Sequence, residues 1–254
     1  MGAKSCIEFK GVSKFFPGCL ALNDVSFSIE KGEVHALIGE NGAGKTTLIN
    51  ILHGVCNSSE GEILINNKKT VFASTHDAIL YGIVKVHQEV NLIGEMTIAQ
   101  NMMLGHEPRK GIFTDQKRMD KETHTLLKKL KSNLNPADKI SGLSVGDMQI
   151  IQIAKALYLN AEIICFDEPT SSLSNNEVEV LFDIIRELKE KGITIIFISH
   201  RLDEIFRIAD RVTVLRDGCY INTFNMDGLT KEKMVQSMIG RDVSFSSIIL
   251  ILFI

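Results

Sequence analysis

Several signals that define whole classes of protein are missing from this sequence of 254 residues. None of its five cysteines forms a C-x-x-C pair, and an odd number leaves no complete disulfide framework, so we expect reduced thiols. The seven histidines show neither H-E-x-x-H nor zinc-finger spacing, and we expect no dedicated metal cage. A net charge of -3 gives no electrostatic reason to expect a nucleic-acid partner, which disfavours DNA binding.

A long hydrophobic run is missing as well. No window approaches the roughly 18 consecutive apolar residues that cross a bilayer. Residues 1–14 have no continuous apolar core, and this is not the pattern of a secretory signal. We therefore expect that, if the protein acts at a membrane, it does so as a peripheral subunit.

The order of apolar runs favours an α/β fold with one large domain. Strand-like runs alternate with helix-like segments, which predicts a mostly parallel sheet covered on both faces. From about residue 89 to 157 helical periodicity dominates, and we interpret this stretch as an inserted helical subdomain. Strands are predicted at 7–9, 25–29, 34–38, 62–65, 70–72, 83–87, 163–167, 193–199 and 212–215, and helices near 45–54, 176–191 and 202–209.

A glycine-rich segment between a predicted strand and a predicted helix matches the phosphate-binding pattern G-x-x-x-x-G-K-[ST] completely. Its glycines let backbone N–H groups wrap a phosphate, and the helix that follows adds its positive dipole end. We expect Lys45 to contact the β and γ phosphates and the Thr46 hydroxyl to ligate Mg²⁺. The strand, lysine, hydroxyl and helix together disfavour a plain glycine-rich turn. The candidate nucleotide-binding residues of the loop are Gly39, Asn41, Gly42, Gly44, Lys45, Thr46 and Thr47.

A second candidate motif is the pair of acids Asp167 and Glu168, which directly follows the apolar run at 163–166. A buried strand delivers such carboxylates to the carboxyl edge of the sheet, where α/β proteins bind ligands. We expect Asp167 to hold Mg²⁺ and Glu168 to act as general base on the attacking water. The alternative is a solvated acidic turn, which would not require the preceding apolar residues.

The segment L-S-V-G-D-M-Q, residues 143–149, precedes this strand and is followed by apolar residues at helical spacing. Ser144 with Asp147 three residues later forms the pattern of a capping box. Taken alone, the segment could be merely a well-started helix.

Together, these motifs resemble the ATP-binding-cassette (ABC) ATPases. The phosphate loop, the L-S-x-G-x-x-Q signature, the D-E-P strand end and the I-S-H strand end at residue 200 occur in that family's order. The 122 positions between Lys45 and Asp167 leave room for a whole subdomain, which simple P-loop kinases do not need. The resemblance covers about residues 4–243. It implies a P-loop nucleotide-binding domain with an antiparallel β subdomain and an inserted helical subdomain at about 89–157.

The resemblance also implies roles for residues outside the phosphate loop and the D-E-P strand end. Gln88 resembles the glutamine that contacts Mg²⁺ and water and links to the membrane subunit, although a lone glutamine is usually a surface residue. His200 resembles the switch histidine near the γ-phosphate, with a helix-capping histidine as the alternative. Ser174 lies in the loop that faces the partner cassette. Phe16 is placed like the aromatic that stacks on adenine, with Phe15 as its competitor.

The signature departs from the common L-S-G-G-Q form at Val145 and Asp147. In ABC dimers the signature helix lies across the partner's ATP, and Ser144 and Gly146 preserve the hydroxyl and N–H groups that would meet the γ-phosphate. A carboxylate facing phosphate would repel it, so we expect Asp147 to turn back to its own helix start. The sequence of this region is similar to that of monosaccharide-import ATPases of the ribose and galactose type.

The resemblance implies an ATP-hydrolysing subunit at the cytoplasmic face of the cell membrane. Its implied partners are a second cassette, integral membrane permease subunits and, indirectly, an extracytoplasmic solute-binding protein. The alternatives are a nucleoside importer, a non-transport ABC protein such as a repair or translation factor, and a cassette that binds ATP without independent turnover. Sugar-import ATPases usually carry two cassettes, whereas one is present here, resembling the N-terminal one. We interpret the apolar residues 244–254 as a fragment end or frame change, with a membrane-surface anchor as the alternative.

Overall fold

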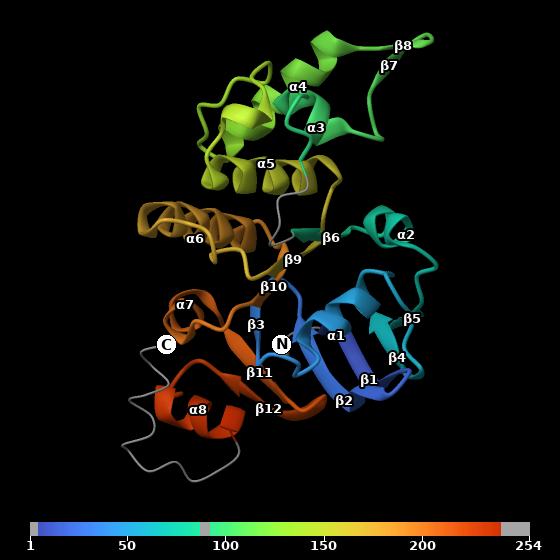
Figure 1. Cartoon of the computed structure of the whole chain (residues 1–254), viewed down its shortest axis with the longest axis vertical. Coiled ribbons are helices and arrows are strands. Elements are labelled where there is room, and N and C mark those ends of the chain that lie inside the picture. Colours follow the sequence, from blue (N-terminus) through green and yellow to red (C-terminus); the bar gives the residue numbers. More distant parts are fainter. Residues whose placement is uncertain (1–4, 87–91, 240–254) are drawn as a thin grey trace.

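The computed structural model describes residues 5–86 and 92–239, and these form a mixed ten-stranded sheet with helices packed against it (Figure 1). Gln88 and residues 244–254 lie outside the described residues. The strands, in spatial order, are β5 (Lys68–Thr70), β4 (Glu60–Ile65), β1 (Ser5–Phe16), β2 (Cys19–Glu30), β12 (Cys219–Asn225), β11 (Arg211–Arg216), β3 (Val34–Ile38), β10 (Thr194–Ile198), β9 (Ile163–Asp167) and β6 (Ile83–Val86).

The sheet has two parts with different pairing. Strands β5, β4, β1 and β2 pair antiparallel, whereas β11, β3, β10, β9 and β6 pair parallel. The predicted α/β class with an antiparallel β part is thereby confirmed. The helices are α1 (Lys45–Leu52), α2 (Thr75–Leu80), α3 (Ile98–Met103), α4 (Gln116–Lys129), α5 (Val145–Tyr158), α6 (Asn175–Glu190), α7 (Leu202–Ile208) and α8 (Lys231–Ile239).

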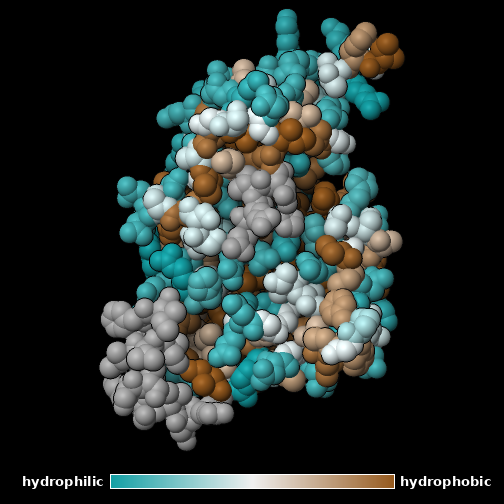
Figure 2. Space-filling view, viewed as in Figure 1, coloured by the Kyte–Doolittle hydropathy of each residue, from teal (hydrophilic) through white to brown (hydrophobic). Residues whose placement is uncertain are grey.

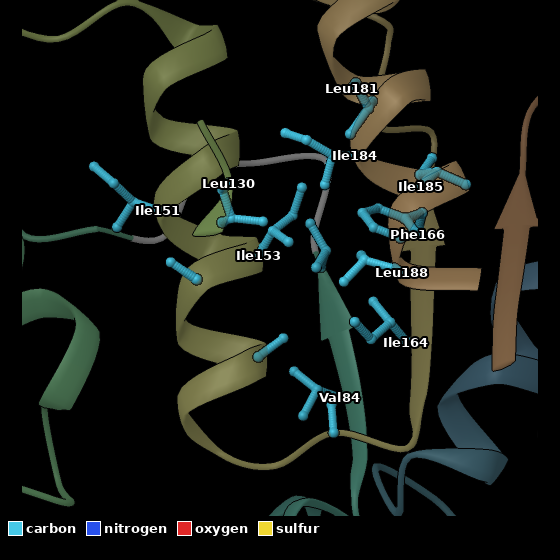
Figure 3. Close-up of a cluster of buried hydrophobic side chains, with 14 of the residues drawn as sticks. Val84, Leu130, Ile151, Ile153, Ile164, Phe166, Leu181, Ile184, Ile185 and Leu188 are labelled. Carbon is cyan, nitrogen blue, oxygen red and sulfur yellow. The ribbon is translucent and has the colours of Figure 1, made fainter. Parts of the chain in front are cut away.

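Alternating residues of β9 and β10 contribute to two different apolar clusters on the two faces of the sheet. On β9, Cys165 belongs to the cluster that includes the buried face of α1, whereas Ile164 and Phe166 belong to the cluster that includes α5 and α6. Figure 3 shows Ile153 of α5 pointing toward the β9 and α6 side chains of this second cluster. Because successive side chains of a strand face opposite sides, this alternation lets one strand be buried on both faces.

Helices α3, α4 and α5 gather at one end of the molecule, above α6 and away from the antiparallel strands (Figure 1). Leu127 of α4 and Leu130, the C-cap residue of that helix, are both buried in the same apolar cluster. A small hairpin, β7 (Arg109–Lys110) and β8 (Phe113–Thr114), lies in the same region and was not predicted. Its two-residue strands are too short to give a periodic sequence signal.

The tip of this hairpin is unusually apolar for a surface. Ile112 is 90% exposed and Phe113 is 73% exposed, and Figure 2 shows the corresponding brown projection at the edge of the molecule.

Among the described residues, none of the helices is long and apolar enough to cross a membrane.

A buried histidine links the stability of the sheet to pH. His35 on β3 is fully buried, its Nδ1 lies 2.8 Å from Glu33 Oε1, and its Nε2 lies 2.7 Å from Thr213 Oγ1. Burial lowers the pKa of His35, although the hydrogen bond to Glu33 opposes this shift. The folded protein therefore binds this proton less readily than the unfolded chain does. The stabilisation is fully present above about pH 6.5 and is lost as the pH falls below that value.

We expect the free energy of unfolding to fall between pH 7 and pH 5, and His35→Gln to flatten that fall. The uptake of one proton on unfolding changes the free energy of unfolding by ~1.4 kcal/mol per pH unit. His35→Gln can reduce the slope of that free energy against pH by at most this amount. Denaturant titrations at several pH values measure the slope, with His124→Gln at an exposed position as the control. An unchanged slope in His35→Gln would show that His35 does not carry this linkage.

Candidate nucleotide-binding site

The loop between β3 and α1 is held in its shape by glycines. Gly39 has φ 155°, and a Cβ added there would lie 2.2 Å from the Leu215 carbonyl oxygen. Gly44 is the N-cap of α1 in a left-handed conformation, and a Cβ there would lie 2.7 Å from the Ala21 carbonyl oxygen. Any side chain at either position would displace neighbouring backbone, so this course of the loop requires glycine.

Lys45 begins α1 and folds back across the loop. Its Nζ donates hydrogen bonds to the carbonyl oxygens of Gly39, at 2.7 Å, and Glu40, at 3.0 Å. Burial lowers the pKa of Lys45, and the nearby carboxylates Glu168 and Asp167 oppose that shift. The ammonium group therefore lies inside the loop and near two acids, which places a positive charge where the loop's N–H groups can bind an anion.

An open pocket of about 380 Å³ joins the loop to more distant residues. Phe16 at the end of β1 contributes one wall and is 44% exposed, so it is not a core residue. Phe15 is exposed as well but does not line this pocket. The other lining residues are Cys19, Leu20, Ala21, Asn41, Gly42, Ala43, Gly44, Lys45, Thr46, Thr47 and Glu168.

The carboxyl end of β9 brings Glu168 to this pocket, and Asp167 directly precedes it as the last residue of the strand. Glu168 has a positive φ of 49°, and its N–H donates to the Ile198 carbonyl oxygen at 3.0 Å, which fixes the turn out of the strand. His200, at the end of the neighbouring strand β10, has its Nδ1 3.4 Å from Glu168 Oε1. The structure therefore brings the candidate base and the candidate switch histidine together. A left-handed conformation costs a non-glycine residue energy, and such residues cluster at functional sites.

A buried carboxylate braces the two loops that carry Glu168 and His200. Both the Thr170 hydroxyl and the Ser199 hydroxyl donate to Glu204 Oε2, each at 2.8 Å. Glu204 is 3% exposed and comes from α7. This buried role of Glu204 was not predicted from the sequence, because an acid in the first turn of a helix is usually a surface feature.

The signature segment forms the start of α5 and lies beside α6. The Ser144 side chain caps the helix by accepting from the Asp147 N–H at 3.1 Å, and its hydroxyl donates to Asp147 Oδ2 at 2.9 Å. Asp147 thus turns back to its own helix start, as expected from the sequence. The Gly146 N–H donates to Glu177 Oε1 at 3.2 Å, and a Cβ on Gly146 would lie 2.4 Å from that oxygen.

Glu177 was not predicted to have a role, and its carboxylate occupies the anion position of the signature helix. Hydrogen bonds from the Ser174 side chain and backbone lower the pKa of Glu177, with further bonds from Ser144 and Gly146. Ser144, Gly146 and Glu177 line a cleft between α5 and α6. Among the described residues, this cleft shares no lining residue with the pocket of the phosphate loop. The starts of α1 and α5 therefore line two different pockets of the described chain.

The oxygen donors at the phosphate loop suit magnesium. Mg²⁺ prefers oxygen ligands and is usually held by one or two carboxylates together with substrate phosphates. Thr46 is exposed at the start of α1, and Asp167 ends β9 with its side chain 15% exposed. A hydroxyl, a carboxylate and the phosphates of a nucleotide would supply such a ligand set.

The sequence of this region decides the family. The family model for ABC transporters matches residues 22–171, which include the phosphate loop, the signature segment and both acids of β9. The chain belongs to the ABC transporter family. Its cassette fold agrees with a solved ATP-binding cassette of an ABC transporter in its ADP conformation. That structure has a TM-score of 0.82 and 30% sequence identity, and the match covers 93% of this chain and 99% of that one.

Two other ABC proteins define what this cassette is similar to. The galactose/methyl galactoside import ATP-binding protein of Clostridium perfringens is 45% identical over 242 residues, which are 95% of this chain and 47% of that protein. A dimeric ATP-binding cassette in a post-hydrolysis state, bound to ADP and Pi, has a TM-score of 0.75 and 27% identity. The match covers 88% of this chain and 100% of that one. The chain spans about half the length of the curated relatives it matches.

Proposed function

We propose that this cassette binds ATP with Mg²⁺ and hydrolyses it as the motor subunit of an importer for a monosaccharide such as galactose or ribose. The observation that carries the proposal is the single pocket shared by Phe16, the phosphate loop and Glu168. An aromatic ring, a loop of N–H groups with a lysine, and a carboxylate are suited to the adenine, the phosphates and the attacking water, respectively.

The residues of this pocket have distinct roles in the proposed reaction. Lys45 and the N–H groups of its loop bind the β and γ phosphates, and Phe16 stacks on the base. Glu168 accepts a proton from the water that attacks the γ-phosphorus, and the bond from that phosphorus to the β–γ bridging oxygen breaks, so that ADP and phosphate are released. His200, 3.4 Å from Glu168, holds the carboxylate in place and donates toward the γ-phosphate. Thr46 and Asp167 would hold Mg²⁺, which would neutralise charge on the phosphates. The role of Gln88 as a further ligand stays a prediction from the sequence.

The site is completed by the signature helix of a second cassette. Ser144 and Gly146 start a helix whose N–H groups suit a phosphate, yet their cleft is separate from the phosphate loop of the same chain. Two copies packed face to face would place each signature helix over the other's nucleotide. The dimeric cassette with ADP and Pi supports this arrangement, since its fold matches the chain.

The transport role is supported by the galactose-import relative, which is 45% identical to nearly the whole chain. We infer that the cassette works at the cytoplasmic face of the membrane with permease subunits, which receive sugar from an extracytoplasmic solute-binding protein. Closure of the two cassettes on ATP would drive the permease, and hydrolysis would reopen them. Residues 4–243 would constitute the nucleotide-binding domain, with 89–157 as its helical subdomain.

ATP turnover by the isolated chain, measured across a wide range of protein concentration, tests the proposal. The rate per chain should rise steeply with concentration, because two copies are needed for each complete site. Ser144→Arg should abolish this rise while ATP binding persists, since the arginine blocks only the partner's site. No turnover at any concentration, or a rate per chain that does not depend on concentration, would overturn hydrolysis at a shared site.

A further inference from the structure

A lysine lies beside the proposed metal ligand Asp167. Lys85 on β6 is paired in register with Cys165 on the adjacent parallel strand β9, and Asp167 lies two residues further on the same face. The Lys85 Nζ is 2.8 Å from Asp167 Oδ2, and the two side chains are 6% and 15% exposed. Asn50 of α1 offers its Oδ1 to the same ammonium at 3.4 Å. The ammonium group thus lies on the α1 side of the sheet, the side of the phosphate loop.

Nothing else among the groups described around Lys85 can balance its charge. Cys165, which pairs with Lys85 across the two strands, is fully buried and offers a thiol rather than a carboxylate. Asn50 is an uncharged amide. A buried ammonium without a counter-ion is strongly unfavourable, and removing one partner of a buried pair is much more costly than removing both. Asp167 is therefore the only described carboxylate that holds Lys85 in this strand.

The pairing has a consequence for the metal. One of the two oxygens of Asp167 is engaged by a cation that belongs to the protein. A divalent ion that approaches the same carboxylate meets a positive charge a few ångströms away and a ligand whose charge is already balanced. Like charges in a partly buried site disfavour each other by the same electrostatics that shift a pKa.

We propose that Lys85 competes with Mg²⁺ for Asp167. In the absence of the metal the Lys85 ammonium pairs with the Asp167 carboxylate, and this pairing weakens the binding of Mg²⁺. This inference rests on the proposed function, because it takes Asp167 as a magnesium ligand. Lys85 is a positioning residue: it acts on the metal through Asp167 and does not line the nucleotide pocket. Asn50 gives the displaced ammonium a second acceptor.

The test is a magnesium titration of fluorescent ATP-analogue binding by Lys85→Met. The neutral side chain should lower the half-saturating Mg²⁺ concentration by about tenfold, which is the effect expected of removing one neighbouring like charge. Lys85→Gln should give the same shift if the methionine variant folds poorly. Lys85→Arg keeps the charge and should stay within about twofold of the wild type. Lys69→Met, on an exposed lysine of β5, controls for the loss of a positive charge as such.

Thermal unfolding supplies a second readout that does not depend on catalysis. In EDTA, Lys85→Met should unfold at a lower temperature than the wild type, because Asp167 loses its partner. Saturating Mg²⁺ with the ATP analogue should remove most of that difference, since the metal then supplies the missing charge. A merely structural ion pair would leave the difference unchanged.

The outcomes separate this inference from the proposal on which it rests. If the wild type binds the analogue with Mg²⁺ and the half-saturating Mg²⁺ concentration of Lys85→Met is unchanged or higher, competition by Lys85 is wrong and the proposed function stands. If the wild type shows no magnesium-dependent binding, the metal role of Asp167 fails and the inference fails with it.

Discussion

Replacing Glu168 by glutamine will lower ATP turnover by about 10²- to 10⁴-fold and leave ATP binding intact. Glutamine keeps the size of the side chain but cannot accept a proton from the attacking water. Glu168 lines the nucleotide pocket and lies 3.4 Å from His200, so the change is confined to the place where chemistry is proposed. Steady-state phosphate release measures turnover, and fluorescence titration with an ATP analogue measures binding.

Glu162→Gln is the matched control for this variant. Glu162 is an exposed acid directly before the same strand, β9, and lies at its opposite end from the pocket. It should retain the turnover of the wild type. Turnover by Glu168→Gln within a few-fold of the wild-type rate would contradict the assignment of the general base.

Replacing Lys45 by methionine will weaken ATP binding by about 100-fold or more, because hydrogen bonds from a charged donor contribute ~1.5–3 kcal/mol each. The methionine keeps the length of the side chain and removes the ammonium that lies within the phosphate loop. Isothermal titration calorimetry with ATP measures the change. The result distinguishes a phosphate site from a glycine-rich turn that merely resembles one.

Two controls keep this prediction specific. Lys31→Met removes a lysine at an exposed position and should bind ATP as the wild type does. Thermal unfolding of Lys45→Met without nucleotide reports the loss of the bonds to Gly39 and Glu40, which contribute to the loop but not to the ligand. A folded Lys45→Met protein with wild-type affinity would contradict the phosphate role of this lysine.

Much of the fold was predictable because its signals are local. The strands at 34–38 and 163–167 are found with the predicted bounds, since each is a short, mostly apolar run that ends at a glycine or an acid. Between the predicted strands at 62–65 and 70–72, Asn66 and Asn67 form a turn in the structure, because asparagine tolerates the positive φ found at both positions. Strand β12 and helix α8 were not predicted: every residue of β12 is half-buried or exposed and α8 buries only Met234 and Val235, so neither segment carries a strong apolar period.

The candidate site was predictable as far as its motifs extend, and no further. Motifs and chain order bring Glu168 and the phosphate loop to one edge of a parallel sheet. The contacts of Lys85 with Asp167 and of Gly146 with Glu177 depend on the register of two strands and on the packing of two helices. Neither quantity is encoded in a local pattern, so these partners appear only in the structure.

A mixing experiment tests the shared site most directly. A chain with Lys45→Met lacks a working phosphate loop but keeps its signature helix, and a chain with Ser144→Arg has the opposite defect. Each alone should be inactive, and a mixed pair should contain one complete site. The account predicts that equal mixing restores ATP turnover to up to about a quarter of the wild-type rate, since half of random pairs are mixed and each has one of two sites. No recovery at any ratio of the two folded variants would contradict it.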